Sequence, residues 1–135
     1  MTNTYQSSSL PEENAAVAMI MRDAGYALEM SYNGNASSSV LFDQAAALRN
    51  FFGYSKHVRY YERSQKSAAK WAQMIYDELA AGRPIIFGAT DAINNGGHAF
   101  VIDGYDEEGL VHVNWGWEGA SNGYYQIALL NPLIN

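Results

Sequence analysis

The segment between Asn95 and Tyr105 is the strongest candidate for a catalytic site in the sequence. In it two glycines precede His98, which stands at the start of an apolar strand. Glycines at such a point let the backbone of a substrate approach closely. A histidine at the mouth of a strand, supported by Phe100 and Ile102, is placed to act as a general base. The competing interpretation is a core histidine satisfied by a backbone carbonyl, and position alone does not separate the two.

A second segment, from His112 to Gly119, contains the groups that such a base needs. An imidazole that accepts protons requires a partner that fixes its tautomer and a wall that keeps water from competing. Asn114, Trp115 and Trp117 offer an amide and two large aromatic rings. Each tryptophan alone is more often a core residue, but two tryptophans separated by glycine, opposite a Gly-Gly-His segment, favour a functional site.

A metal site is disfavoured. Its candidate ligands would be His98, His112 and Asp103, but Asp103 and His98 have opposite strand parity, and no pair has helical or turn spacing. We therefore expect no metal and no cofactor. His57 is interpreted as a surface residue.

Composition excludes several classes of partner. The 135 residues carry a net charge of −6 with only 16% charged residues, which argues against nucleic acid and against an anionic membrane surface. No run of about 18 apolar residues could span a bilayer, and the segment from Met1 to Ser9 lacks the features of a signal peptide. The sequence contains no cysteine, which removes disulfides, thiolate metal sites and a cysteine nucleophile within these residues.

Three helices are predicted in the first part of the chain. The first begins at a capping-box pattern at Ser9 and runs to Gly25, and the second is capped by Ser39 and stops at Gly53. The third opens at Ser67, and its apolar residues recur with helical period until Gly82. Between the first two helices, residues 33–38 are small and polar and are interpreted as a loop.

Strand periodicity follows the third helix. A short strand is predicted before that helix from His57 to Tyr61, and four more follow it: Pro84 to Ala89, Gly97 to Tyr105, Leu110 to Trp115, and Gly123 to Leu129. Residues 106–109 supply the turn between the middle two. Helices followed by an antiparallel sheet indicate an α+β fold, which we expect to be one unit over residues 1–135. The abrupt end after the last strand suggests a fragment.

The chain resembles the streptopain family of papain-like cysteine peptidases over roughly residues 10 to 132. The order and spacing of the matching residues are highly specific. They are Gly96-Gly97-His98-Ala99-Phe100-Val101-Ile102-Asp103-Gly104, His112-Val113-Asn114-Trp115-Gly116-Trp117, Gly123-Tyr124-Tyr125 and Leu130-Asn131-Pro132. The resemblance implies a papain-like fold that is incomplete here, because in that family the catalytic cysteine lies on a helix N-terminal to everything present in this chain.

By this resemblance His98 is the base of a Cys-His pair, and the isolated chain is expected to be inactive because the cysteine lies outside it. Papain-like enzymes orient the histidine with an asparagine, whereas the streptopain pattern puts Trp115 at that position. Strand residues alternate sides, so only one of Asn114 and Trp115 can face His98. We favour Trp115 beside the imidazole with Trp117 as its shield, and Asn114 stays the alternative.

The resemblance also implies substrate contacts and partners. Ala36, Ser37 and Gly97 are candidate substrate-binding residues, although a plain helix-capping loop explains the first two equally well. Glu118 stands where the family usually has a second glycine. The implied partners are a protein or peptide substrate and an N-terminal cysteine-bearing segment or propeptide, and the implied location is secreted.

Two other functions compete with the endopeptidase interpretation. A decayed papain-like module could serve as a binding or inhibitory domain, and the source polypeptide would then lack the cysteine upstream. Another papain-like hydrolase, such as a leader peptidase or a cell-wall amidase, usually has a different polar partner for the histidine and lacks Trp-Gly-Trp.

Overall fold

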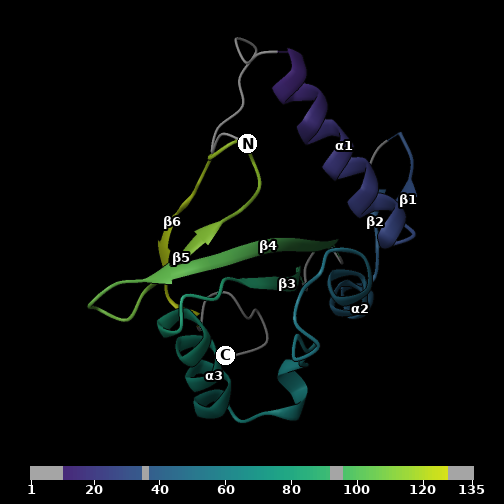
Figure 1. Cartoon of the computed structure of the whole chain (residues 1–135). Helices are drawn as coiled ribbons and strands as arrows, with labels where there is room; N and C mark the ends of the chain where they lie inside the picture. Colours follow the sequence, from purple (N-terminus) through teal and green to yellow (C-terminus); the bar gives the residue numbers. More distant parts are fainter. Residues whose placement is uncertain (1–10, 35–36, 92–95, 128–135) are drawn as a thin grey trace. The chain divides into compact units, whose positions relative to one another are not determined.

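The computed structural model describes residues 11–34, 37–91 and 96–127. The chain divides into two compact units, Met1–Tyr60 and Tyr61–Asn135, each of which is described by itself. The first is built around two helices, and the second holds a helix and a four-stranded antiparallel sheet (Figure 1). The α+β class predicted from the sequence is confirmed. The single unit over residues 1–135 stays a prediction.

The first unit contains α1 (Pro11–Ala27), a small hairpin of β1 (Ser31–Tyr32) and β2 (Ser37–Ser38), and α2 (Leu41–Phe51). Helix α1 has proline as its first residue and two glutamates in its first turn, as an N-terminus favours. Its predicted cap, Ser9, lies outside the described residues. The hairpin corrects the predicted loop, because Ser37 and Ser38 pair with Tyr32 and Ser31.

Helix α2 begins one residue later than predicted. Its N-cap is Val40, which makes no side-chain capping bond, so the prediction that Ser39 caps the helix is wrong. Gly53 ends the helix as predicted, because it adopts a left-handed φ of 69°. Beyond it the N–H of Tyr54 donates to the carbonyl of Leu48 at 3.1 Å.

The strand predicted from His57 to Tyr61 is absent from the structure, which has a turn and irregular backbone there. Local side chains engage the backbone groups that a strand partner would need. Arg49 Nη1 donates to the carbonyl of Val58 at 2.7 Å, and Ser55 Oγ accepts from the N–H of His57 at 3.2 Å. Alternating residue types predicted the strand, and these local bonds replaced it.

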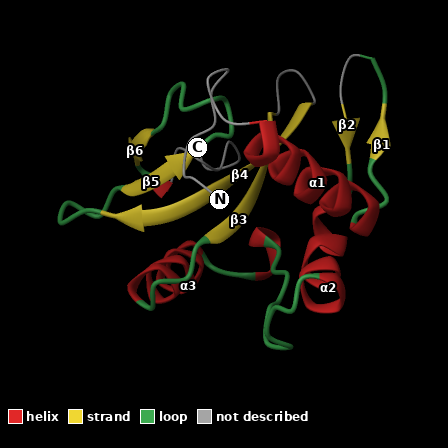
Figure 2. Cartoon of the chain, turned by 45° about the horizontal axis from the view of Figure 1, so that its top comes forward, coloured by secondary structure: helices red, strands yellow, loops and turns green. Residues whose placement is uncertain are grey.

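The second unit contains a short 3-10 turn (Arg63–Gln65), α3 (Ala68–Ala80), β3 (Ile85–Asp91), β4 (Gly96–Tyr105), β5 (Val111–Asn114) and β6 (Gly123–Tyr125). The strands follow one another in the order β3-β4-β5-β6, all antiparallel (Figure 2). Ser67 caps α3 as predicted, because its side chain accepts from the N–H of Lys70. The turn after β4 is also as predicted, with Asp106 Oδ1 accepting from the N–H groups of Glu108 and Leu110.

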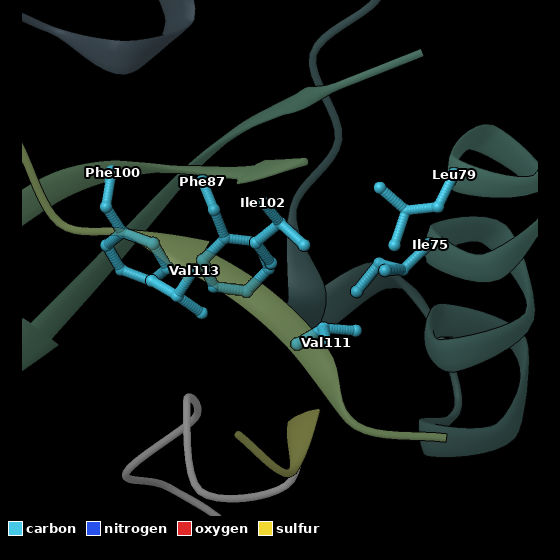
Figure 3. Packing of buried hydrophobic residues seen from close by; sticks show 7 residues of the cluster. All are labelled: Ile75, Leu79, Phe87, Phe100, Ile102, Val111 and Val113. Carbon is cyan, nitrogen blue, oxygen red and sulfur yellow. The ribbon is translucent and has the colours of Figure 1, made fainter. Parts of the chain in front are cut away.

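The core of this unit lies between α3 and one face of the sheet. Seven buried residues form it, two from the helix and five from the strands (Figure 3): Ile75, Leu79, Phe87, Phe100, Ile102, Val111 and Val113. Phe100 and Ile102 are the buried residues of β4 and lie two residues apart, so both point to the face of the strand that packs on the core. His98 belongs to the same alternation and therefore projects from this face, at the end of the core. No helix among the described residues is long and apolar enough to cross a membrane.

The core makes a first prediction. Ile102→Ala should lower the free energy of unfolding by about 2–5 kcal/mol, because Ile102 is 0% exposed and its truncation leaves a cavity. Ile86→Ala on the neighbouring strand is the matched control, since Ile86 is 47% exposed and should cost far less. Denaturant unfolding of both variants tests this, and equal losses would contradict the assigned strand faces.

Candidate active site

His98 is the third residue of β4 and pairs with Ala89 of β3. Its ring is half-buried and continues the row of Phe100 and Ile102. The rings of His98 and Phe100 lie 6.2 Å apart at 24°, so the apolar core supports the imidazole from within the strand. His98 thus lies at the edge of the packed core, where the residues of β4 change from buried to partly exposed.

Two tryptophans from the segment after β5 flank this imidazole. Trp117 stacks on His98 with ring centroids 4.7 Å apart, and Trp115 lies at 6.2 Å with an angle of 22°. The two indoles stack on each other at 5.6 Å and 14°. Trp115 also packs against Phe100 and Tyr125, whereas Trp117 is 51% exposed. The inner indole anchors the segment, and the outer one covers the imidazole.

A main-chain carbonyl orients the imidazole. His98 Nε2 lies 2.8 Å from the carbonyl oxygen of Trp115. A carbonyl can only accept a hydrogen bond, so Nε2 carries the proton. In the neutral ring Nδ1 then holds the lone pair and is the atom able to take up a proton.

Asn114 does not contact the imidazole. Its Oδ1 instead accepts from the N–H of Gly116 at 3.0 Å. The structure therefore brings together the three residues favoured from the sequence, His98, Trp115 and Trp117. The contact through the carbonyl of Trp115 has no signature in residue type, so sequence reasoning could not have specified it.

The segment that follows has an unusual backbone. Gly116, Glu118, Gly119 and Ser121 all have left-handed φ values, between 53° and 89°. Glu118 has a φ of 53°, a conformation that glycine adopts without strain, so the backbone favours the glycine that the family usually has there and Glu118 departs from it at a conformational cost. Sequence reasoning missed one residue here: Asn122 Oδ1 accepts from the N–H of Trp115 at 3.0 Å.

The candidate substrate-binding residues lie in different units. Gly97 is exposed at the start of β4, next to His98, and a Cβ atom there would lie 3.9 Å from the carbonyl oxygen of Ala89, its nearest neighbour among the described residues. Ser37 is exposed in β2 of the first unit. Ala36 lies outside the described residues. Their role stays a prediction.

The remaining histidines lie elsewhere. His112 Nδ1 is 2.6 Å from Asp103 Oδ1, beside a bulge that shifts the register between Ile102 and Gly104. His57 is exposed, with Nδ1 3.2 Å from Ser55 Oγ. Among the described residues no group of three or more acidic or histidine side chains could hold a metal ion.

Comparison with known proteins identifies the family. The Peptidase C10 family model matches residues 1–125. The chain belongs to the Peptidase C10 family. Similar proteins include the thiol protease/hemagglutinin PrtT of Porphyromonas gingivalis, 41% identical over 90% of this chain, and streptopain of Streptococcus pyogenes, 35% identical over 96% of it. The chain spans 14% of PrtT and 32% of streptopain.

Two solved structures of interpain A share the fold. The active wild-type interpain A cysteine protease of Prevotella intermedia superposes with a TM-score of 0.87 at 41% identity, covering 98% of this chain and 55% of interpain A. A prointerpain A fragment in which a cysteine is replaced by alanine gives a TM-score of 0.85 at 43% identity, with 98% and 41% covered. The papain-like α+β fold implied by the sequence is thereby confirmed for this C10 chain.

The inner indole of the C10 site makes a second prediction. Trp115 Nε1 is buried without a hydrogen-bond partner among the described residues, which costs about 1–3 kcal/mol. Trp115→Phe removes that donor and keeps a ring against Phe100, so its unfolding free energy should stay within about 1 kcal/mol of the parent. Trp115→Ala should lose about 3 kcal/mol because the packing goes as well. Denaturant unfolding separates the two, and a Phe variant as unstable as the Ala variant would contradict the unpaired donor.

Proposed function

We propose that this chain is the histidine-bearing part of a cysteine endopeptidase that hydrolyses peptide bonds by a Cys-His mechanism. His98 is its base, and the cysteine comes from a segment outside these residues. One observation carries the proposal: the imidazole donates through Nε2 to the Trp115 carbonyl and stacks on Trp117, which leaves Nδ1 as the proton acceptor. Membership of the Peptidase C10 family supports it.

In the proposed reaction Nδ1 of His98 takes the thiol proton, and the thiolate attacks the carbonyl carbon of the scissile peptide. The C–N bond breaks as the imidazolium gives that proton to the leaving amine, and a thioester remains. Water then attacks the thioester while Nδ1 accepts a proton from it. The C–S bond breaks, the acid product leaves, and the proton returns to the thiolate.

The contacts of His98 are compatible with both protonation states that this cycle uses. The carbonyl of Trp115 accepts from Nε2 whether the ring is neutral or protonated, and this bond is stronger when the donor is charged. The face of an indole attracts a cation, and Trp117 lies against the imidazole at 4.7 Å. Both contacts can therefore persist when the ring is protonated during the cycle. Trp117 also limits access of water to the ring.

The proposal includes the partners of the site. A protein or peptide is the substrate, with Gly97, Ala36 and Ser37 as its proposed contacts. An N-terminal cysteine-bearing segment or a propeptide is the proposed polypeptide partner, since this chain holds no cysteine and matches only part of its relatives. We also propose that the whole protein is secreted, as the family resemblance implies.

The absence of cysteine makes a third prediction. The isolated chain should show no peptidase activity and should not react with a thiol-directed epoxide, because it has no sulfur nucleophile. Intact-mass spectrometry after incubation should show the unmodified mass. An added inhibitor mass would contradict the assignment of the nucleophile to another segment.

A fourth prediction concerns the enzyme reconstituted by fusing or co-refolding the cysteine-bearing segment of a C10 relative with this chain. His98→Ala should abolish turnover, because both proton transfers depend on it. Trp117→Ala should lower kcat more than it raises KM, because the indole stacks on the imidazole and shields it rather than binding substrate. Turnover in the His98→Ala enzyme would overturn its role as base.

The lack of a cysteine also favours one other candidate, a decayed module that binds without catalysing. The coding sequence upstream of Met1 separates the two. A cysteine on an upstream helix supports the peptidase, and a serine or alanine in its place supports the binding module.

A further inference from the structure

We propose that Asn122 is a positioning residue for His98, acting through the main chain of Trp115. The inference rests on the proposed function of His98. Two hydrogen bonds meet on Trp115: its N–H donates to Asn122 Oδ1 at 3.0 Å, and its carbonyl accepts from His98 Nε2 at 2.8 Å. The amide of Asn122 thus holds the residue that in turn holds the imidazole.

Strand pairing cannot supply this restraint. The last pair between β4 and β5 is Val101 with Asn114, and the last pair between β5 and β6 is Val113 with Gly123. Trp115 lies just beyond both ladders. Continuing the register of β5 and β6 would place Ser121 opposite Trp115, but Ser121 is bent away by a left-handed φ of 62°. The side chain of Asn122 takes the place of the missing strand partner.

The left-handed loop makes the restraint necessary. Four residues between 116 and 121 have positive φ, so the loop is held by a few bonds and not by a regular ladder. Asn114 Oδ1 holds the N–H of Gly116, which belongs to the same peptide group as the Trp115 carbonyl. Asn122 holds the preceding peptide group. Together the two amides fix the peptide planes on both sides of Trp115, and Asn122 does so from the far end of the loop.

The chemistry of the contact provides a conservative variant. Asn122 uses only its carbonyl oxygen, so Asn122→Asp keeps an acceptor and makes it charged. Asn122→Ala removes the acceptor, so the peptide group that carries the Trp115 N–H loses this restraint. Gln126→Ala is the matched control, because Gln126 is another exposed amide side chain just beyond the same strand.

The test uses the full chain with nitrogen-15-labelled histidine and tryptophan. Solvent exchange of the His98 Nε2 proton should become about tenfold faster in Asn122→Ala, the factor for loss of a bond worth about 1.4 kcal/mol. Asn122→Asp and Gln126→Ala should exchange no faster than the parent chain. A folded Asn122→Ala variant with unchanged exchange, or an Asp variant as fast as the Ala variant, would overturn the proposal.

Two further measurements cover the other outcomes. If Asn122→Ala does not fold, the Asn122→Asp variant tests the proposal instead. Solvent exchange of the Trp115 amide proton should be slower in this variant, because the acceptor is charged. Unchanged exchange would contradict the hydrogen bond between Trp115 and Asn122. In the reconstituted peptidase, Asn122→Ala should lower kcat with KM nearly constant. The two proposals can also fail separately. If His98 exchange is faster in Asn122→Ala but the reconstituted enzyme with the parent sequence is inactive, the proposed function is refuted and the positioning role of Asn122 is retained.

Discussion

The hydrogen bond between His98 Nε2 and the Trp115 carbonyl is the constraint on which the site depends. It fixes which nitrogen carries the proton, and it requires β4 and β5 to pair in one register. Val101 opposite Asn114 places Trp115 just past the end of β5, within reach of a histidine three residues back along β4. A slip by one residue would turn His98 to the other face of the sheet and separate the two groups.

The group that accepts the hydrogen bond from His98 belongs to the main chain, so it responds to mutation differently from a side-chain acceptor. No substitution of Trp115 deletes its carbonyl, so variants at this position test packing and shielding rather than the acceptor itself. The acceptor depends instead on what holds the peptide in place. Here that is the packing of the indole on Phe100 and Tyr125, together with the amides of Asn114 and Asn122.

Much of the sheet and its helix was predictable because their periodicities are strong. The apolar alternation of β4 and the Ser67 cap of α3 are local signals, and both appear where predicted. The predicted strand at His57 failed because Arg49, eight residues earlier, holds the backbone just after it. Only the start of the strand predicted from Gly123 to Leu129 is seen, ending at Tyr125, and residues 128 and 129 lie outside the described chain.

In the site, the residue types alone indicated His98, Trp115 and Trp117. The hydrogen bond to the Trp115 carbonyl and the role of Asn122 depend on backbone geometry that no residue pattern encodes.

The most direct test of the account is the tautomer of His98 in the neutral ring, read from a long-range proton–nitrogen correlation spectrum of the labelled chain above the titration of its histidines. We predict a protonated Nε2 and an unprotonated Nδ1, because Nε2 donates to the Trp115 carbonyl. Trp115→Phe should keep this tautomer, because it keeps the carbonyl. A protonated Nδ1 in the parent chain would contradict the account, because the nitrogen required to accept the thiol proton would already carry one.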